Sequence, residues 1–339
     1  SYGANATYSH GQLTAFTGNL GAGGTNANYE TNVGYEEALR LKQEPFGTQT
    51  GVYNKLTYNI RGQLSQVRVG TTAMPDTGWN RGALIFHYSQ QSWAGSGTDN
   101  NGNLQHADIY IPADDQISSY TLLSQQYGYD ALNRLSSVSE SNNVSAGTDS
   151  QTFSYDRYGN RGISSAMGGV NNASLSFNIS TNQLTAINLV TQTFDSAGNM
   201  TGNSSVAWAY DAENHLTRAY QTGNPSTQYG IYIYDGDGHR ARRWNATDGE
   251  VWQVYGLDGE LLAEYNANAS ASSPNKEYGY SNGRLLITAD SSANINWIVS
   301  DHLGTPRMVI DKTGSLSNVK RHDYLPFGEE IVAGQGGRS

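Results

Sequence analysis

Aromatic and aliphatic positions recur in this chain around short polar segments, and this pattern predicts β-hairpins. The recurring unit is an aromatic residue, Asp or Asn, two variable residues, Gly or Asn, a polar residue and an aliphatic residue; residues 129–135 (YDALNRL) are one copy. Asp or Asn at the first turn position accepts a hydrogen bond from a backbone amide ahead of it. Gly or Asn three residues later tolerates the left-handed backbone of a type I turn followed by a bulge.

The spacing of this unit places its aromatic and aliphatic side chains opposite each other. If the Asp is residue i of the turn, residue i pairs with i+4 and residue i−1 pairs with i+5. The ring and the aliphatic side chain then share one face of the hairpin, where such cross-strand pairs contribute roughly 0.2–1 kcal/mol each. One hairpin alone is marginally stable, so neighbouring hairpins must pair to bury this face.

Six near-complete copies of the unit follow one another, with looser copies at 8–13, 255–261 and 280–285. Successive aromatic positions between 129 and 280 are 16 to 26 residues apart, which leaves room for two short strands and their connections. The repetition predicts an all-β chain rather than scattered turns in an unrelated protein. The residues expected to define the repeat turns are Tyr58, Gly62, Tyr129, Asp130, Tyr155, Asp156, Gly159, Phe194, Asp195, Gly198, Tyr210, Asp211, Tyr234, Asp235 and Gly238.

One segment, residues 35–43 (YEEALRLKQ), departs from the β pattern. It reads either as a short helix without a convincing cap or as a strand in which Ala38, Arg40 and Lys42 alternate with Leu39 and Leu41. Both interpretations stay open on the sequence alone.

Composition supports a sheet-and-turn protein. Hydrophobic residues make up 37% of the chain, below the roughly 45–50% usual for globular domains. Tyr is far more frequent than Phe (23 against 7), and Tyr suits half-wet sheet surfaces because its ring is apolar and its hydroxyl forms hydrogen bonds. The 39 glycines supply turns that need positive φ.

Charge and the missing cysteines exclude several function classes. A formal charge of −10 argues against nucleic acid or an anionic membrane as the main partner. The absence of cysteine excludes disulfides, thiolate nucleophiles and thiolate metal sites. No stretch approaches the ~18 apolar residues that a membrane helix needs, so no membrane span is expected.

Other candidate chemistry is weak. Residues 235–238 (DGDG) resemble part of a calcium loop but lack its later acidic ligands and coincide with a repeat turn. The glycine-rich segment 18–24 has no strand and helix around it that would support phosphate binding. His302 and His322 are expected to be exposed polar residues. We therefore expect no metal, no cofactor and no catalytic residue.

Three segments near the C-terminus carry a more specific signature. Residues 297–307 (WIVSDHLGTPR), 310–314 (IDKTG) and 324–330 (YLPFGEE) resemble the D-H-L-G-x-P-R, D-x-x-G and Y-x-P-F-G-E elements that begin the RHS-associated core segment, and the repeats resemble the YD repeats of RHS proteins. The resemblance is clear over 116–330 and looser over the whole chain. The matching residues are Asp301, Gly304, Pro306, Arg307, Asp311, Gly314, Pro326, Phe327 and Gly328.

The resemblance implies a spiral of YD-repeat β-hairpins that forms part or all of a hollow shell, as in RHS proteins, the C components of insecticidal toxin complexes and teneurins. In bacterial members this shell encloses a variable C-terminal toxin, released by self-cleavage at aspartates beyond the P-F-G-E element. Asp301 and Asp311 are therefore expected to be turn residues. We expect no enzyme here, because the sequence ends at Ser339 before that block, and we expect one section of a shell from a longer precursor.

The expected organisation is one continuous β architecture in three parts: a divergent part of the shell at 1–115, regular repeats at 116–296, and the start of the core segment at 297–339. The expected function is a secreted or cell-surface bacterial scaffold. Its expected partner is its own C-terminal toxin or other segments of the same precursor, with self-association through open sheet edges as a further possibility.

Two alternatives remain open. One is a cell-surface module that binds carbohydrate or protein through exposed aromatic residues. The other is an enzyme, for which two close carboxylates in a buried pocket would be evidence. The tryptophans available to a binding surface are Trp79, Trp93, Trp208, Trp244, Trp252 and Trp297.

Overall fold

The computed structural model describes residues 4–20, 27–47, 51–89, 99–144, 148–163, 173–281 and 283–331. These residues form strands β1 to β29 and one 3-10 helix, η1 (Leu316–Asn318), with no α-helix in the described part of the chain. The paired strands are antiparallel, and strands adjacent in sequence lie side by side in four sheets of 3, 10, 3 and 13 strands. The all-β prediction is confirmed.

The first half of the chain contains the three-stranded sheet β1–β3 and the ten-stranded sheet β4–β13. Their bounds are β1 Ala4–Ser9, β2 Gln12–Gly18, β3 Ala27–Thr31, β4 Gly34–Tyr35, β5 Leu41–Phe46, β6 Val52–Tyr58, β7 Leu64–Gly70, β8 Gly82–His87, β9 His106–Pro112, β10 Tyr120–Tyr129, β11 Leu135–Asn142, β12 Thr148–Tyr155 and β13 Arg161–Ile163.

The second half contains the three-stranded sheet β14–β16 and the thirteen-stranded sheet β17–β29. Their bounds are β14 Leu175–Phe177, β15 Leu184–Ile187, β16 Val190–Thr191, β17 Thr193–Phe194, β18 Met200–Gly202, β19 Val206–Tyr210, β20 Leu216–Gln221, β21 Asn224–Ile233, β22 Arg242–Asn245, β23 Gly249–Tyr255, β24 Leu261–Asn266, β25 Lys276–Ser281, β26 Arg284–Asp290, β27 Ile295–Ser300, β28 Pro306–Asp311 and β29 Lys320–Arg321.

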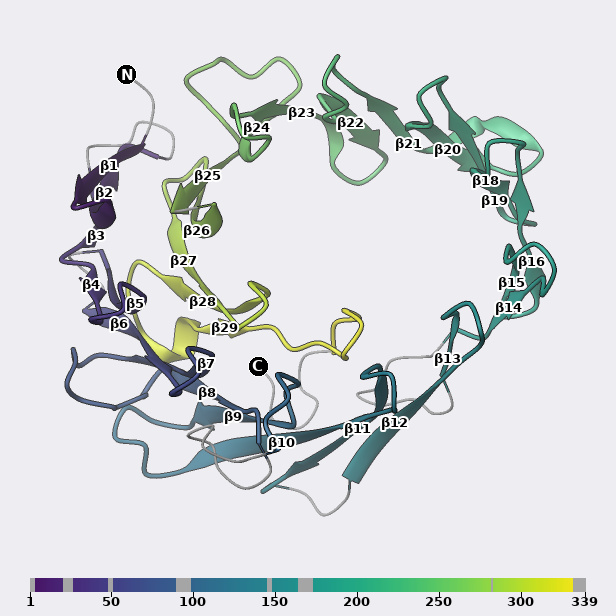
Figure 1. The fold of residues 1–339 in the computed structure, drawn as a ribbon. Helices are drawn as coiled ribbons and strands as arrows, with labels where there is room; N and C mark the ends of the chain where they lie inside the picture. The colour runs from purple at the N-terminus through teal and green to yellow at the C-terminus, as the bar shows by residue number, and fades with distance from the viewer. Residues whose placement is uncertain are drawn as a thin grey trace.

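The sheets follow one another around an open ring, and the chain overlaps its own beginning as a spiral. The outer layer of this ring is called the wall below. Figure 1 shows β27, β28 and β29 inside the ring, against the part of the wall formed by β5 to β9. The overlap buries one apolar core between the two layers, and its wall side includes Val67, Leu84, Phe86, Ile109 and Leu123, whereas its inner side includes Leu286, Ile287, Trp297, Val299, Met308 and Ile310. The predicted spiral is therefore confirmed, and its core lies where the spiral overlaps.

Trp297 joins the two ends of the spiral. Its ring stacks on that of Phe46 with 6.1 Å between centroids, and its indole Nε1 donates a hydrogen bond of 2.8 Å to the backbone carbonyl of Tyr29. The side chain is 4% exposed, so both its apolar ring and its polar N–H are satisfied in the core.

The repeat turns have the register that the spacing predicts. Tyr129 lies opposite Leu135, just as Tyr58 lies opposite Leu64. The carboxylate Oδ1 of Asp130 accepts hydrogen bonds of 2.9 Å from the amides of Leu132 and Arg134. The left-handed position falls three residues after the turn acid or amide, and it is occupied in the six copies by Gly62, Asn133, Gly159, Gly198, Asn214 and Gly238.

The repeat tyrosines also bind the preceding hairpin. The hydroxyl of Tyr155 donates to the carbonyl of Leu135 at 2.7 Å, and Leu135 is the aliphatic residue of the repeat before it. The same bond recurs along the wall, so that each such hydroxyl holds its hairpin against the previous one. The other hydrogen bonds of this kind, from a tyrosine hydroxyl to a backbone carbonyl, are Tyr35 to Leu13 (2.9 Å), Tyr88 to Leu64 (3.2 Å), Tyr210 to Met200 (2.9 Å), Tyr234 to Leu216 (3.1 Å) and Tyr255 to Arg240 (3.3 Å).

The polar residue of the turn contacts the next tyrosine ring. His215 stacks on Tyr234 with 4.6 Å between ring centroids, and the guanidinium of Arg134 lies 4.4 Å from the centroid of Tyr155. The other side of the same residue faces its own turn acid, since Arg134 Nε lies 2.7 Å from Asp130. Arg134 thus links its own turn to the tyrosine of the next hairpin.

Residues 35–43 form a repeat turn, so the helix interpretation is wrong, and the strand interpretation holds only from Leu41 onward. Tyr35 ends β4 and lies opposite Leu41 at the start of β5. Glu36 occupies the turn position of Asp, and Leu39 adopts the left-handed conformation with a φ of 62°. This copy lacks both the Asp and the Gly that define the pattern, and for this reason the sequence does not reveal it.

The expected division at 115/116 and 296/297 remains a proposal. The first bound separates β9 from β10, which pair along their length, and the second lies within β27.

A buried acid lies where the beginning of the spiral meets β26. Glu30 of β3 is fully buried beside Glu44 of β5, and Glu44 is paired with Arg284 of β26. Burial first, and then the neighbouring charge of Glu44, raise the pKa of Glu30 to about 9. Glu30 is therefore a neutral acid at pH 7.

Replacing Leu39 by Gly should stabilise the protein by about 1 kcal/mol, because Gly adopts positive φ without strain. The Leu39 side chain is 68% exposed, so little burial is lost. Urea unfolding measures the change, with Leu39→Ala as the control that keeps the strain. Equal stability of the Gly and Ala variants would contradict this account of the turn.

The stability of the protein should fall as pH rises from about 4.5 to about 9, because the unfolded chain releases the Glu30 proton near its ordinary pKa and the folded chain retains it up to about 9. Glu30→Gln should remove this dependence and be about 1–3 kcal/mol more stable than the parent at pH 9. Urea unfolding at pH 6 and pH 9 tests this, with exposed Glu213→Gln as the control. An unchanged pH slope in Glu30→Gln would refute the assignment.

Candidate functional site in the C-terminal segment

Residues 301–331, called the inner segment below, carry the motif residues and lie inside the ring (Figure 1). Their apolar side chains pack against the wall in a second small core, in which Leu325 and Ile331 contact Val138 and Phe153. The ring of Phe327 meets that of Phe153 edge to face, with 5.0 Å between centroids. The inner segment is therefore docked on β11 and β12.

The D-H-L-G-x-P-R motif is itself a repeat turn. The amide of Asp301 donates to the carbonyl of Thr305 at 2.9 Å, and Asp301 Oδ1 accepts from the amides of Leu303 and Thr305. Gly304 takes the left-handed position with a φ of 84°, and Pro306 lies opposite Ser300. Asp301 thus has the turn position expected for it.

The Y-x-P-F-G-E motif forms a second turn of this kind. The amide of Leu325 donates to the carbonyl of Glu329 at 2.8 Å, with Pro326 and Phe327 in the turn and Gly328 at a φ of 97°. The guanidinium of Arg161 lies 3.6 Å from the centroid of the Phe327 ring. This contact between Arg161 and Phe327 holds the inner segment to β13.

Asp311 and Gly314 form the third motif turn. The carbonyl of Asp311 accepts from the amide of Gly314 at 3.1 Å, and Asp311 Oδ1 accepts from the amide of Thr313 at 3.0 Å. The carbonyl of Gly314 accepts a hydrogen bond of 2.6 Å from Nε of Arg81, which lies just before β8. This turn therefore ties the inner segment to the wall.

Arg307 forms the polar centre of the inner segment. Its guanidinium lies 3.3 Å from Oδ2 of Asp301 and 2.5 Å from Oδ1 of Asp323. All three side chains are nearly buried, at 12%, 7% and 6% exposure. Burial lowers the pKa of Arg307, but the carboxylates of Asp323 and Asp301 outweigh burial and hold this pKa above its ordinary value.

The polar centre continues into the wall through Gln125. Gln125 Nε2 donates to Glu140 at 2.8 Å and to Oδ2 of Asp323 at 3.4 Å, and the hydroxyl of Tyr127 donates to Gln125 Oε1 at 2.6 Å. Burial raises the pKa of Tyr127, which stays a neutral hydrogen-bond donor. The sequence did not reveal this network. Two charged residues beside the motifs could have indicated it: Arg307 within the first motif, and Asp323 just before the Y-x-P-F-G-E motif.

A cavity of about 280 Å³ lies beside this centre, between the inner segment and the wall. Polar and apolar side chains from both layers line it. They include Phe86, Gln125, Tyr127, Asp301, His302, Arg307 and Leu325.

Both histidines of this region differ from the expectation that they are exposed. The ring of His302 packs on Phe86, with 4.6 Å between centroids, and burial lowers its pKa, so it is neutral at pH 7. His322 is half-buried, and its Nδ1 lies 2.6 Å from Glu330. The expectation was wrong because the inner segment presses these motif side chains against the wall.

The remaining candidates have structural surroundings. Asp235 Oδ1 accepts from the amides of Asp237 and His239, as a turn acid does. The glycine-rich segment 18–24, where no phosphate site was expected, lies partly outside the described residues, and Trp93 lies outside them. Among the other tryptophans, Trp297 is buried, Trp252 is 44% exposed, and Trp79, Trp208 and Trp244 are half-buried. Within the described residues, no helix is long and apolar enough to cross a membrane.

Known proteins match this chain over part of its length and over a small part of their own. The family model described as Teneurin YD-shell matches residues 97–334. A protein named tRNA3(Ser)-specific nuclease WapA, from Bacillus spizizenii, is 28% identical over 179 residues, which are 52% of this chain and 7% of that protein. The tRNA nuclease WapA of Bacillus subtilis is 29% identical over 130 residues, which are 38% of this chain and 5% of that protein. The chain spans less than a tenth of the length of both proteins.

Solved structures share the fold over nearly the whole chain. A structure of TcdB2-TccC3 without its hypervariable C-terminal region has a TM-score of 0.70 at 16% identity, covering 97% of this chain and 17% of that chain. A structure of the Photorhabdus luminescens Tc holotoxin pore, with a mutated TccC3, has a TM-score of 0.67 at 15% identity, covering 97% of this chain and 18% of that chain.

Replacing Arg307 by Met should destabilise the protein by about 3–5 kcal/mol, because Asp301 and Asp323 would remain buried without a countercharge. Urea unfolding measures this loss, and limited proteolysis reports release of the inner segment. The control is Lys320→Met, which changes an exposed cation nearby. If both variants unfolded at the same urea concentration, the polar centre would not anchor the segment.

Proposed function

Since this chain belongs to the teneurin YD-shell family, we propose that it forms part of a shell that encloses a toxin carried C-terminally in the same precursor and used in bacterial competition. The chain is a shell scaffold by family and by fold. The enclosed cargo, the competition and the secreted or cell-surface location are the parts that we propose.

The position of the inner segment is the observation that carries this proposal. The inner segment lies on the concave side of the wall (Figure 1), and Ile331, the last described residue, is buried against Val138 and Phe153 at 4% exposure. The amide of Ile331 donates to the carbonyl of Asp323 at 2.8 Å, which holds Ile331 against the rest of the inner segment. A polypeptide that continues from this region begins inside the curve of the shell.

The relatives suggest a cargo class. Both curated relatives are named tRNA nucleases, and this chain matches only 7% and 5% of their lengths. The charge of −10 makes this chain itself unsuited to nucleic acid, which supports a role as wall for a separate toxic domain. A nuclease is therefore one cargo that fits.

The surface-binding alternative has less support. It requires exposed tyrosines and tryptophans in a row. Among the described residues the exposed ones lie on strands or turns that do not pair with one another, and they are Tyr8, Tyr120, Tyr158, Tyr229 and Trp252. The indole Nε1 of Trp252 donates to Glu250 at 2.7 Å, so its polar edge already has a partner in the protein.

A second candidate function, hydrolysis by an acid pair, is favoured by one observation. Asp301 and Asp323 are both buried and converge on Arg307 beside the 280 Å³ cavity. This is the pair of buried carboxylates that an enzymatic interpretation requires. The Arg307 guanidinium contacts both carboxylates and would have to move before they could act together on a substrate.

Limited proteolysis of the complete precursor tests the shell function. The domain that follows this chain should survive a trypsin concentration that digests the same domain expressed alone, because the wall excludes the protease. Arg307→Met should shorten its survival at least tenfold, and Lys320→Met should not. Equal digestion of the enclosed and isolated domains, or a precursor without a following domain, would overturn the proposal.

Mass spectrometry of the same precursor reads the second candidate. If the acid pair acts, the precursor splits on incubation and Asp323→Asn prevents the split. An equal yield of fragments from the parent and Asp323→Asn would exclude the acid pair.

A further inference from the structure

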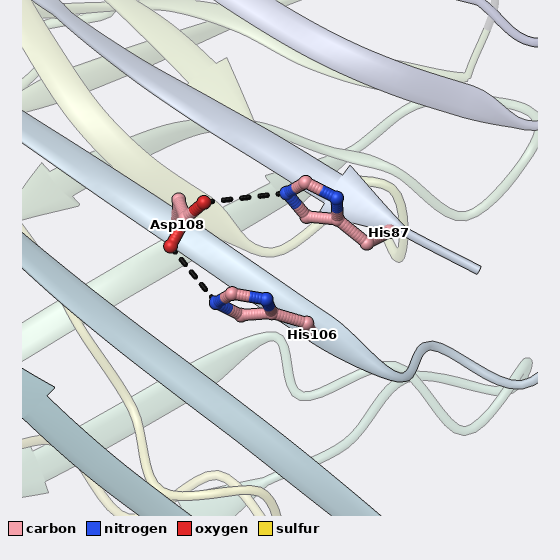
Figure 2. A group of neighbouring side chains, drawn as sticks. All are labelled: His87, His106 and Asp108. Atoms are coloured by element: carbon pink, nitrogen blue, oxygen red, sulfur yellow. Dashed lines mark hydrogen bonds and ion pairs between the residues drawn. The ribbon is translucent and has the colours of Figure 1, made fainter. Parts of the chain in front are cut away.

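A cluster of two histidines and one aspartate lies on the outer face of the wall, away from the inner segment. Phe86 of β8 and Ala107 of β9 point into the core. Because side chains alternate along a strand, His87 and the pair His106 and Asp108 point to the opposite face. Figure 2 shows the three side chains projecting together from β8 and β9.

Strand pairing fixes the positions of the three side chains. His87 and His106 are direct cross-strand partners, and Asp108 follows His106 on the same face of β9. The two imidazole rings stack with 4.8 Å between centroids and 20° between planes. His87 ends β8 and His106 begins β9, so the paired ends of two neighbouring strands hold the cluster.

The potential ligand atoms converge. Nε2 of His87 lies 3.2 Å from Oδ2 of Asp108, and Nε2 of His106 lies 2.9 Å from Oδ1. One ligand atom from each residue lies within 4.8 Å of the others. Ligands on a tetrahedral zinc ion, with bonds near 2.0–2.1 Å, are about 3.3 Å apart, so small movements of the side chains would admit the ion.

We propose that His87, His106 and Asp108 form a site for a divalent transition-metal ion, with zinc the best fit. Two imidazole nitrogens and one carboxylate oxygen are a ligand set that zinc accepts, and a water molecule completes the tetrahedron. The side chains are 20%, 32% and 13% exposed, so an ion can reach them from solvent without opening the fold.

The surroundings of Asp108 prepare it to be a ligand. Ser124, its cross-strand partner on β10, donates from Oγ to Oδ1 at 2.5 Å and orients the carboxylate. A carboxylate is ionised at neutral pH, as a metal ligand must be.

Another cluster in the described residues, Asp235, Asp237 and His239, does not have these properties. Asp235 and Asp237 are exposed, and Asp235 Oδ1 is already bonded to two amides of the repeat turn. It serves as an internal control, because it contains the same residue types without a prearranged site.

An ion at the proposed site would join β8 to β9 on the face opposite the apolar core. It would reinforce the wall where the spiral overlaps, and this role is independent of any enclosed toxin. Metal binding is therefore separable from the shell function proposed above.

Isothermal titration of the EDTA-treated chain with zinc chloride tests the proposal. One equivalent should bind with a micromolar or tighter dissociation constant, and the thermal midpoint should rise by several degrees at saturating zinc. His87→Gln and His106→Gln should each weaken binding at least tenfold, whereas His239→Gln and His322→Gln should not.

Substitution with cobalt gives a second readout that does not depend on stability. A tetrahedral site with nitrogen and oxygen ligands should give visible absorption bands that the His87→Gln variant lacks. Thermal unfolding in EDTA should be similar for parent and variants, which shows that they fold. Absence of binding at 100 μM zinc, or equal affinity in the parent and both variants, would overturn the proposal.

Discussion

The hydrogen bond from a repeat tyrosine to the hairpin before it is the interaction on which the wall depends. The turn acid and the left-handed glycine make each hairpin, but they are local and would also form an isolated hairpin. The Tyr155 hydroxyl, by contrast, bonds to the carbonyl of Leu135 in the neighbouring repeat, and Tyr234 bonds to Leu216 in the same way. This requirement contributes to the excess of Tyr over Phe, because a phenylalanine ring could fill the same face without linking successive hairpins.

A second constraint closes the spiral. The described residues contain no α-helix that could cover the wall, and the overlap of the two ends supplies an apolar layer instead. Trp297, Met308 and Ile310 bring that layer to the wall, and Arg307 fixes the segment that follows. The inner segment is held by both an apolar contact and a polar network, and the polar network gives it a defined position.

Much of this architecture could be predicted from the sequence because the turn chemistry is local. Tyr129 and Leu135 lie six residues apart, and their pairing follows from the type I turn between them. Residues 35–41 form the same unit, but the sequence does not predict it, because Glu36 and Leu39 replace the Asp and Gly of the pattern. A degenerate copy becomes recognisable only when its strands are seen to pair.

The contacts that give the inner segment its place could not be predicted in this way. Trp297 bonds to a carbonyl 268 residues earlier, and Gln125 meets Asp323 across 198 residues. Such pairs follow no period in the sequence. For the same reason the histidine and aspartate cluster is invisible in the sequence, since His87 and His106 are brought together only by the pairing of β8 with β9.

The most direct test of the wall is the stability contributed by single tyrosine hydroxyls. Tyr155→Phe, Tyr210→Phe and Tyr234→Phe each remove one bond between hairpins and keep the ring, whereas Tyr229→Phe changes a ring that is 46% exposed. Urea unfolding should show a loss of about 1 kcal/mol for each of the three and almost none for Tyr229→Phe. If all four variants were as stable as the parent, the hydroxyl bonds would not hold successive hairpins together.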